Sequence, residues 1–374
     1  MTKLVYLARD KELHLFDLEL GSNEQLTYPF YPGKQIPSIW PVWSPDRRWI
    51  AYFQPPVQGE KAKICVTEVD GLEMLVLAEM EERLPIYIYW SPDSKRLAVI
   101  EQTETLELLV YSLDGSKPIS LDDGAPIFFC WTPDSSGIIA HLVHPIERRS
   151  RVEYYSILDS DCDYIISTQA GGFCAPVFLN GQLIFAEKVG SLTQVFLYDL
   201  LTRRKTPLCA FNGVLALQPR PNRNQIAIAV TEKADGSPYM GVQLFDLETG
   251  KLQVIHSEPV QALFWTPDGE NLLLSSINLE QQWLEWSFWD GETVSLICNF
   301  RPTREQVFFL HFFEQFSLSH QIITPEGDEF YFSGYEPPEK RTEEFPQPMI
   351  FRASLEKLGG LEPMMVGLFP SLGN

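Results

Sequence analysis

The chain has 374 residues, of which 45% are hydrophobic and 13% aromatic, a composition that can bury a large core and excludes a disordered protein. Asp and Glu number 50 against 29 Lys and Arg, and the formal charge of −21 repels phosphate backbones and anionic lipids. No run approaches the roughly 20 apolar residues of a membrane span. We therefore expect a folded protein that binds neither nucleic acid nor membranes.

The first thirty residues contain three short strand-like segments, at 4–8, 12–17 and 25–27. No apolar stretch there is long enough for a signal peptide, so we expect a cytoplasmic protein. A periplasmic protein whose leader has been removed is the alternative. The six cysteines form no Cys-x-x-Cys pair and lie mostly in apolar segments, which predicts free thiols.

A four-residue motif, Trp-Ser/Thr-Pro-Asp, begins at positions 43, 90, 131 and 265. Weaker copies begin at 178, 219 and 323, so that successive copies lie about 41 to 58 residues apart. Proline presets φ for a turn, and Asp, Asn or Gly accept the positions that follow it. The apolar segments on either side of the motif therefore predict the first two strands of a hairpin.

Each repeat continues with a third strand that ends in Asp, as at 195–199 and 242–246, and with a shorter fourth strand, as at 252–255. Four antiparallel strands per repeat make one blade of a β-propeller. The N-terminal segments supply only the second, third and fourth strands of a blade. Residues 366–374 resemble the first strand at 262–270, so the C-terminus is predicted to complete that blade and to close the ring.

These repeats predict a single all-β domain over residues 1–374, a propeller of eight four-stranded blades. A seven-bladed ring is the alternative, and it would leave one repeat without a place. The Trp-Ser-Pro-Asp-x-x-x-Leu-Ala pattern resembles the TolB-like propeller repeats over essentially the whole chain. That family includes the periplasmic protein TolB, the regulatory domains of prolyl-oligopeptidase-type peptidases and free-standing propellers. The resemblance implies a propeller with a binding role, and no active-site motif of the family maps onto this sequence.

Catalytic and cofactor motifs are missing from the sequence. It has no Gly-x-Ser-x-Gly elbow, no Walker loop, no Gly-x-Gly-x-x-Gly and no His-Glu-x-x-His. His141 and His144 are three residues apart near a strand end, a spacing that directs them to opposite faces of the strand. We therefore expect no metal and no cofactor. His320 is predicted to lie on the first strand of the seventh blade, either in the core or facing the channel.

The two longest insertions occupy residues 301–315 and 334–348, around the seventh blade. Loops between strands two and three open on the same face of a propeller as the loops between blades, so both insertions should rise from one face. Thr303-Arg304-Glu305-Gln306 matches a capping box, and phenylalanines recur at helical spacing as far as Phe316. A short helix at 303–316 that covers the channel mouth is predicted, with the start of a long strand as the alternative.

We therefore predict a non-catalytic scaffold that binds a protein or peptide on this long-loop face, where Arg149 and Arg341 could meet a carboxylate or phosphate. A small ligand in the channel is a second partner class. The alternative function is a propeller-type hydrolase or lyase with its site at the channel mouth. The predicted binding residues are Tyr31, Lys34, Arg148, Arg149, His311, Phe313, His320 and Arg341.

Overall fold

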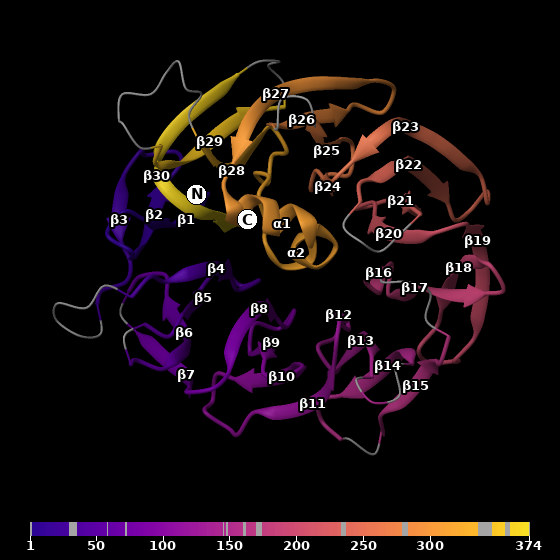
Figure 1. The fold of residues 1–374 in the computed structure, drawn as a ribbon, viewed down its shortest axis with the longest axis horizontal. Helices are drawn as coiled ribbons and strands as arrows, with labels where there is room; N and C mark the ends of the chain where they lie inside the picture. Colours follow the sequence, from indigo (N-terminus) through magenta and orange to yellow (C-terminus); the bar gives the residue numbers. More distant parts are fainter. Residues whose placement is uncertain are drawn as a thin grey trace.

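In this computed structural model of the protein, the described residues are 2–29, 36–57, 59–71, 73–144, 146, 149–159, 162–169, 174–232, 237–278, 283–335, 346–355 and 360–373. They form antiparallel sheets arranged radially in a ring, with two short helices inside it (Figure 1). The all-β propeller predicted from the repeats is confirmed. None of the described helices has the length and apolar character that a membrane crossing requires.

Five four-stranded sheets follow one another around the ring, and in each the strands pair antiparallel in chain order. Their strands are β4 (Ile39–Trp43), β5 (Trp49–Gln54), β6 (Ala62–Glu68) and β7 (Met74–Met80); β8 (Leu84–Trp90), β9 (Arg96–Gln102), β10 (Leu106–Ser112) and β11 (Ile119–Gly124); β12 (Ile127–Trp131), β13 (Gly137–Val143), β14 (Ser150–Ser156) and β15 (Tyr164–Ser167); β16 (Val177–Leu179), β17 (Gln182–Val189), β18 (Leu192–Tyr198) and β19 (Lys205–Phe211); and β20 (Val214–Pro219), β21 (Gln225–Thr231), β22 (Tyr239–Asp246) and β23 (Leu252–Val260).

The remaining strands form one continuous ten-stranded sheet. In sheet order these are β24 (Ala262–Trp265), β25 (Leu272–Asn278), β26 (Trp283–Trp289), β27 (Val294–Pro302), β28 (Glu329–Tyr335), β29 (Pro348–Ser354), β30 (Leu361–Gly373), β1 (Lys3–Ala8), β2 (Leu13–Asp17) and β3 (Asn23–Gln25). A bridge between Ile323 and Phe330 occupies the innermost position beside β28. With that bridge counted as an inner strand, the described strands group into eight four-stranded blades.

One strand, β30, serves two blades and closes the ring. Its first half pairs with β29 as far as Val366, and its second half pairs with β1 from Gly367 to Gly373. The predicted closure by the C-terminus is therefore confirmed, with one correction. Val366 was predicted to belong to the closing inner strand, but it pairs with Met349 and ends the fourth strand of the preceding blade.

The Trp-Ser/Thr-Pro-Asp motif forms the turn between the first and second strands of a blade, and its hydroxyl organises that turn. In the first blade, Ser44 Oγ donates to Asp46 Oδ1 at 2.6 Å and accepts from the backbone N–H of Trp49 at 3.0 Å. The corresponding serine or threonine makes the same two contacts in the blades that follow, at Ser91, Thr132 and Thr266. The aspartates of the motif are thus committed to turn structure, as predicted.

In the four blades that carry it, the motif tryptophan makes a hydrogen bond to the preceding blade. The indole N–H of Trp90 donates to the backbone carbonyl of Val42 at 3.1 Å, across the boundary between two inner strands. Trp131 donates to Tyr89 and Trp265 to Gln218 in the same way. Trp43 donates to Ser371 O at 3.0 Å, across the closure. The repeated motif therefore forms the turn within its own blade and also joins that blade to its neighbour.

Residues 303–319 leave the pattern of the blades. Helices α1 (Arg304–His311) and α2 (Phe313–Ser319) lie inside the ring (Figure 1), and α2 contacts the inner strands β8, β12, β20 and β24. The predicted helix is present, so the alternative of a long strand is wrong. His320 was predicted on the first strand of the seventh blade, but α2 runs through Ser319 and the inner-strand position is taken only at Ile323. None of the six cysteines, all of them described, forms a disulfide.

Candidate functional site

The helical insertion fills the channel from the long-loop face. Thr303 caps α1 by accepting a hydrogen bond from the backbone N–H of Gln306 at 3.1 Å. The side chain of Gln306 accepts from the backbone N–H of Ser333 at 2.9 Å, so it fastens α1 to β28. The side chains of Thr303 and Gln306 are both buried, and their hydrogen bonds hold the insertion against the wall of the ring.

The side chain of Gln315 on α2 pairs with the innermost strand of the third blade, β12, as a neighbouring strand would. Its amide oxygen accepts from the backbone N–H of Phe129 at 2.8 Å, and its amide nitrogen donates to the carbonyl of the same residue at 2.7 Å. Innermost strands have no further neighbour, so their channel-facing backbone groups need other partners. The side chain of Tyr87 adds a hydrogen bond to the backbone carbonyl of Gln315 at 2.8 Å and another to Ser319 Oγ at 2.7 Å.

Glu314 is a buried carboxyl that joins α2 to the fourth and fifth blades. It accepts from the backbone N–H of Ala175 at 3.0 Å and from the hydroxyl of Tyr239 at 2.9 Å. Burial raises the pKa of Glu314 to about 8, although both hydrogen bonds act in the opposite direction. Glu314 is therefore largely protonated at neutral pH, and it holds α2 to the two blades through hydrogen bonds of a neutral carboxyl group rather than through a charge.

The helical insertion, residues 303–319, is called the plug from here on. Aromatic rings pack around it where the ring of blades closes. Trp40 stacks on Phe316 with centroids 4.9 Å apart and packs on Phe369 at 4.5 Å. Trp40 and Phe369 have φ values of 53° and 55°, in the left-handed region that bulky residues rarely adopt. Both precede a proline in the innermost strand of their blade, beside a shift in strand register. The two strained bulges turn their rings toward the plug.

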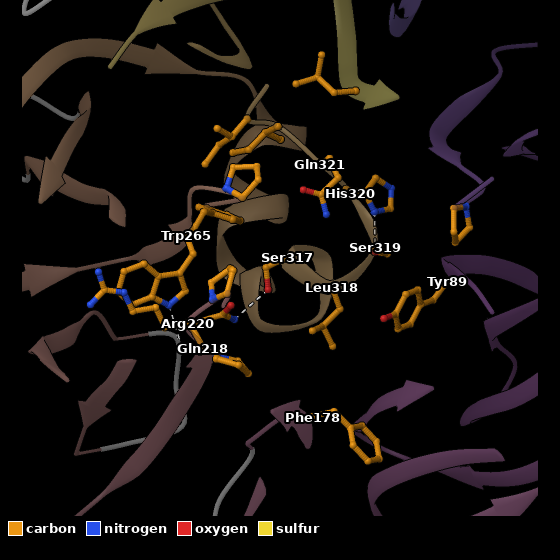
Figure 2. A pocket seen from close by; sticks show the side chains of 18 of the residues that line it. Tyr89, Phe178, Gln218, Arg220, Trp265, Ser317, Leu318, Ser319, His320 and Gln321 are labelled. Carbon is orange, nitrogen blue, oxygen red and sulfur yellow. Dashed lines mark hydrogen bonds between the residues drawn. The ribbon is translucent and has the colours of Figure 1, made fainter. Parts of the chain in front are cut away.

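A cavity of about 700 Å³ remains at the opposite end of the channel. Its floor is the end of the insertion, residues 317–323, and its walls come from the turns between the first and second strands of several blades (Figure 2). Exposed turn residues such as Pro45, Asn180 and Asn222 line it, so it opens on the Pro-Asp turn face. The volume lies in the range of small-molecule sites.

Aromatic rings and uncharged polar groups surround this cavity. The partly exposed rings are Trp43, Tyr89, Phe178 and Trp265, which come from four different blades. Ser317, Ser319 and Gln321 supply hydroxyl and amide groups at the floor (Figure 2). Gln218 donates to Ser317 Oγ at 2.9 Å, so part of the floor is held in place before any ligand arrives.

The charge of the cavity differs from that of the whole chain. No Asp or Glu is among its described lining residues, although the chain carries a formal charge of −21. Its one described charged lining residue is Arg220, whose guanidinium lies over the ring of Trp265 at 5.0 Å and donates to Gln225 Oε1 at 2.7 Å. The aromatic rings of the walls can bind the flat apolar face of a ligand, and the hydroxyl and amide groups of the floor can form hydrogen bonds with the polar groups of that ligand.

Four of the eight residues predicted for binding, Tyr31, Lys34, Arg148 and Arg341, lie outside the described residues. The four that the structure describes are not gathered at one site. Arg149 is exposed on the third blade, and His311 is exposed at the C-terminal end of α1. Phe313 is fully buried under Tyr239 and Phe264, so it presents no surface to a partner.

His320 is buried at the junction of the plug and the cavity. Its Nδ1 lies 2.8 Å from Ser319 Oγ, and its Nε2 has no hydrogen-bond partner. Burial lowers the pKa of this imidazole to about 3, so it is neutral at physiological pH. His141, which sequence spacing separated from His144, bridges the carbonyl of Cys174 and Ser150 Oγ in the core. Among the described residues, no group of three or more His, Cys, Asp or Glu could hold a metal ion.

Apart from His320, the cavity residues were not predicted, because those of the walls lie in or beside a repeated motif that indicates turn structure and those of the floor follow a helix that was predicted only to cover the channel. One signal was available in the sequence. The inner strands of the second and fifth blades carry Tyr89 and Gln218 next to the motif position, where the first blade has an aliphatic residue. Polar groups at that position of a channel-lining strand indicate a wet channel mouth.

No protein-family model matches the chain, and no curated protein matches it. Solved structures share its fold. The chain resembles a prolyl endopeptidase from a structural study of two such enzymes, with a TM-score of 0.59 and 14% identity over 89% of this chain and 49% of that one. Porphyromonas gingivalis dipeptidyl peptidase 4 matches with a TM-score of 0.55 and 11% identity, over 86% of this chain and 53% of that one.

An oligogalacturonate lyase solved in complex with manganese matches with a TM-score of 0.50 and 13% identity, over 74% of this chain and 87% of that one. The first two matches span about half of the longer peptidase chains. At identities this low, the likeness shows the β-propeller fold alone.

Proposed function

We propose that this propeller is a non-catalytic binding protein of the TolB-like repeat type, with its ligand site in the cavity on the Pro-Asp turn face. The observation that carries the proposal is the lining of that cavity. Four partly exposed rings and a polar floor enclose about 700 Å³, and no described lining residue is acidic. A ligand with a flat ring face and several uncharged polar groups fits this lining.

The shape of the channel supports binding rather than passage. The insertion at 303–319 closes the other end through hydrogen bonds of Gln315 and Glu314 to the backbone N–H groups of Phe129 and Ala175, so a ligand enters and leaves through the same mouth. Tyr89 carries a hydroxyl at the wall and Gln321 an exposed amide at the floor (Figure 2). These groups can select among ring-bearing ligands by their polar substituents.

The proposal is tested by filling the cavity. Gln321→Trp places an indole at the floor, at an exposed side chain, and should leave the fold intact. Leu201→Trp is the matched control, because Leu201 is 96% exposed in a turn outside the cavity. Ligand-observed NMR would compare a set of ring-containing polar fragments with acyclic compounds of equal hydrogen-bonding capacity.

We expect ring fragments to bind the wild type and Leu201→Trp, and to lose most of their signal with Gln321→Trp. Fragments that bind Gln321→Trp as well as the wild type would refute the cavity as the site. Conversion of a bound fragment into a product, followed by mass spectrometry, would refute the non-catalytic part of the proposal.

A further inference from the structure

A second recess lies on the opposite, long-loop face, beside α1. Its volume is about 680 Å³, and it is formed by α1, by the ends of β25 and β27 and by the start of β26. Leu284 and Leu310 form a buried apolar base. None of its described residues lines the cavity at the channel mouth, so the two sites are separate.

The rim of this recess exposes apolar side chains that a monomer would ordinarily bury. Val307 is 50% exposed, and Phe308 and Ile277 are each 39% exposed. Val307 and Phe308 are consecutive on α1, so they widen the apolar strip across the helix surface. A contiguous apolar recess with a polar rim is typical of a binding site for another chain.

Arg304 and His311 lie at the two ends of α1, and both are exposed. Arg304 is the one charged side chain among the described lining residues, and it has no ion-pair partner among the residues that the structure describes. His311 adds an imidazole that can donate a hydrogen bond. The described lining contains no carboxylate, so a carboxylate of an occupant would meet a cation and a hydrogen-bond donor.

The recess is held in shape before anything binds. Thr303 caps α1, Gln306 fastens it to β28, and the far side of the helix packs on the ring through buried Phe309. A preformed apolar site loses little entropy when an occupant docks.

We propose that this recess binds a short acidic peptide segment of a partner protein. A bulky apolar side chain of the peptide would lie on Val307 and Phe308, and flanking carboxylates would face Arg304 and His311. Arg304 can hold a carboxylate through two parallel hydrogen bonds. This site would act independently of the ligand cavity proposed above.

The experiment selects a displayed library of random twelve-residue peptides on the full-length protein. Two variants then test where the selected peptides bind. Val307→Glu places a negative charge on the apolar strip. Val189→Glu is its matched control, because Val189 is equally exposed, at 50%, at the end of β17 on the same face of the fourth blade.

We expect enrichment of peptides that carry a bulky apolar residue flanked by Asp or Glu. Their affinity should fall at least tenfold with Val307→Glu and remain unchanged with Val189→Glu. Replacing the peptide's acidic residues by Lys should weaken binding to the wild type, and Arg304→Glu should restore part of that loss.

Three results would overturn the proposal. One is a selection that enriches no peptide, or enriches only basic ones. Another is equal binding to the wild type and Val307→Glu. The third is a wild-type dimer that Val307→Glu dissociates in size-exclusion chromatography with light scattering, because the occupant would then be a second copy of the chain.

Discussion

The wall of the ring and the insertion that fills it are stabilised in different ways. In the wall, antiparallel backbone ladders hold each blade together, and the tryptophans of the Trp-Ser/Thr-Pro-Asp motif repeat one contact to the preceding blade at the four boundaries where the motif occurs. In the insertion, single side chains such as Gln315 and Glu314 reach particular backbone groups of distant blades. The wall thus repeats one set of contacts, whereas the position of the plug depends on a few individual side chains.

This difference shows how a propeller can acquire separate sites on its two faces. The wall keeps its turns short and regular, while one long connection between blades enters the channel. The same insertion borders the cavity at the channel mouth with its C-terminal end and the recess on the other face with α1. Changes to the wall should therefore affect the whole fold, and changes to the plug should affect stability in smaller, separable amounts.

The largest effect is expected from removing residues 361–373. This deletion takes away β30, which supplies strands to two blades and the carbonyl that Trp43 binds across the closure. It exposes strand edges on both sides of the gap, so we expect aggregation and loss of a cooperative thermal transition. Calorimetry and light scattering measure both. Adding the excised segment as a peptide should restore part of the transition, and a truncated chain that melts within a few degrees of the wild type would contradict the closure.

A buried ring of the plug should have the next largest effect. Phe313→Ala leaves a cavity between Tyr239 and Phe264, and we expect a loss of about 3–5 kcal/mol in the free energy of unfolding. Phe308→Ala on the exposed side of α1 is the control and should cost about 1 kcal/mol. Urea denaturation measures both values. Equal losses for the two variants would mean that the plug does not share the core of the ring.

The strand-like contacts of Gln315 should contribute less. Gln315→Leu keeps the apolar volume but leaves the N–H and carbonyl of Phe129 without their partner, at a cost of about 2–3 kcal/mol. The amide of Phe129 should also exchange faster with solvent. Gln321→Leu, at an exposed position, is the control. Unchanged exchange at Phe129 in the Gln315 variant would show that α2 does not protect the inner strand.

The effect of Glu314 depends on pH and is expected to vanish near pH 4.5. Its pKa is about 8 in the folded protein against an ordinary value of 4.5, so folding requires proton uptake between these values. The carboxyl therefore stabilises the fold less as pH rises from about 4.5 to 8, and this cost levels off above 8. Gln can keep both hydrogen bonds without a charge.

We expect Glu314→Gln to match the wild type near pH 4.5 and to exceed it in stability by up to about 5 kcal/mol at pH 9, because the difference between pKa 4.5 and pKa 8 contributes about 1.4 kcal/mol per pH unit. Thermal unfolding across this range gives the measurement. A wild type whose stability is independent of pH relative to the variant would show that the carboxylate is ionised in the folded state.

The repeats were sufficient to predict the ring, the sharing of one blade by the two termini and the helix that begins after Thr303. These features depend on short-range chemistry, because proline, a hydroxyl and an aspartate form a turn within a few residues. The capping residue and the spacing of the phenylalanines indicated α1 in the same way. The position of His320 and the boundary at Val366 were not predicted correctly. Both depend on which neighbouring segment forms backbone hydrogen bonds with the chain where one element ends and the next begins.

Sequence by itself thus determined the repeating wall of this protein, because the same local turn contacts recur in the four blades that carry the motif. Tertiary structure decided what lies inside it. The partners of Gln315 and Glu314 are backbone groups well over a hundred residues away, and no local pattern marks them. The burial of Phe313, the cavity among four aromatic rings and the basic recess beside α1 exist only once the ring has closed around the insertion.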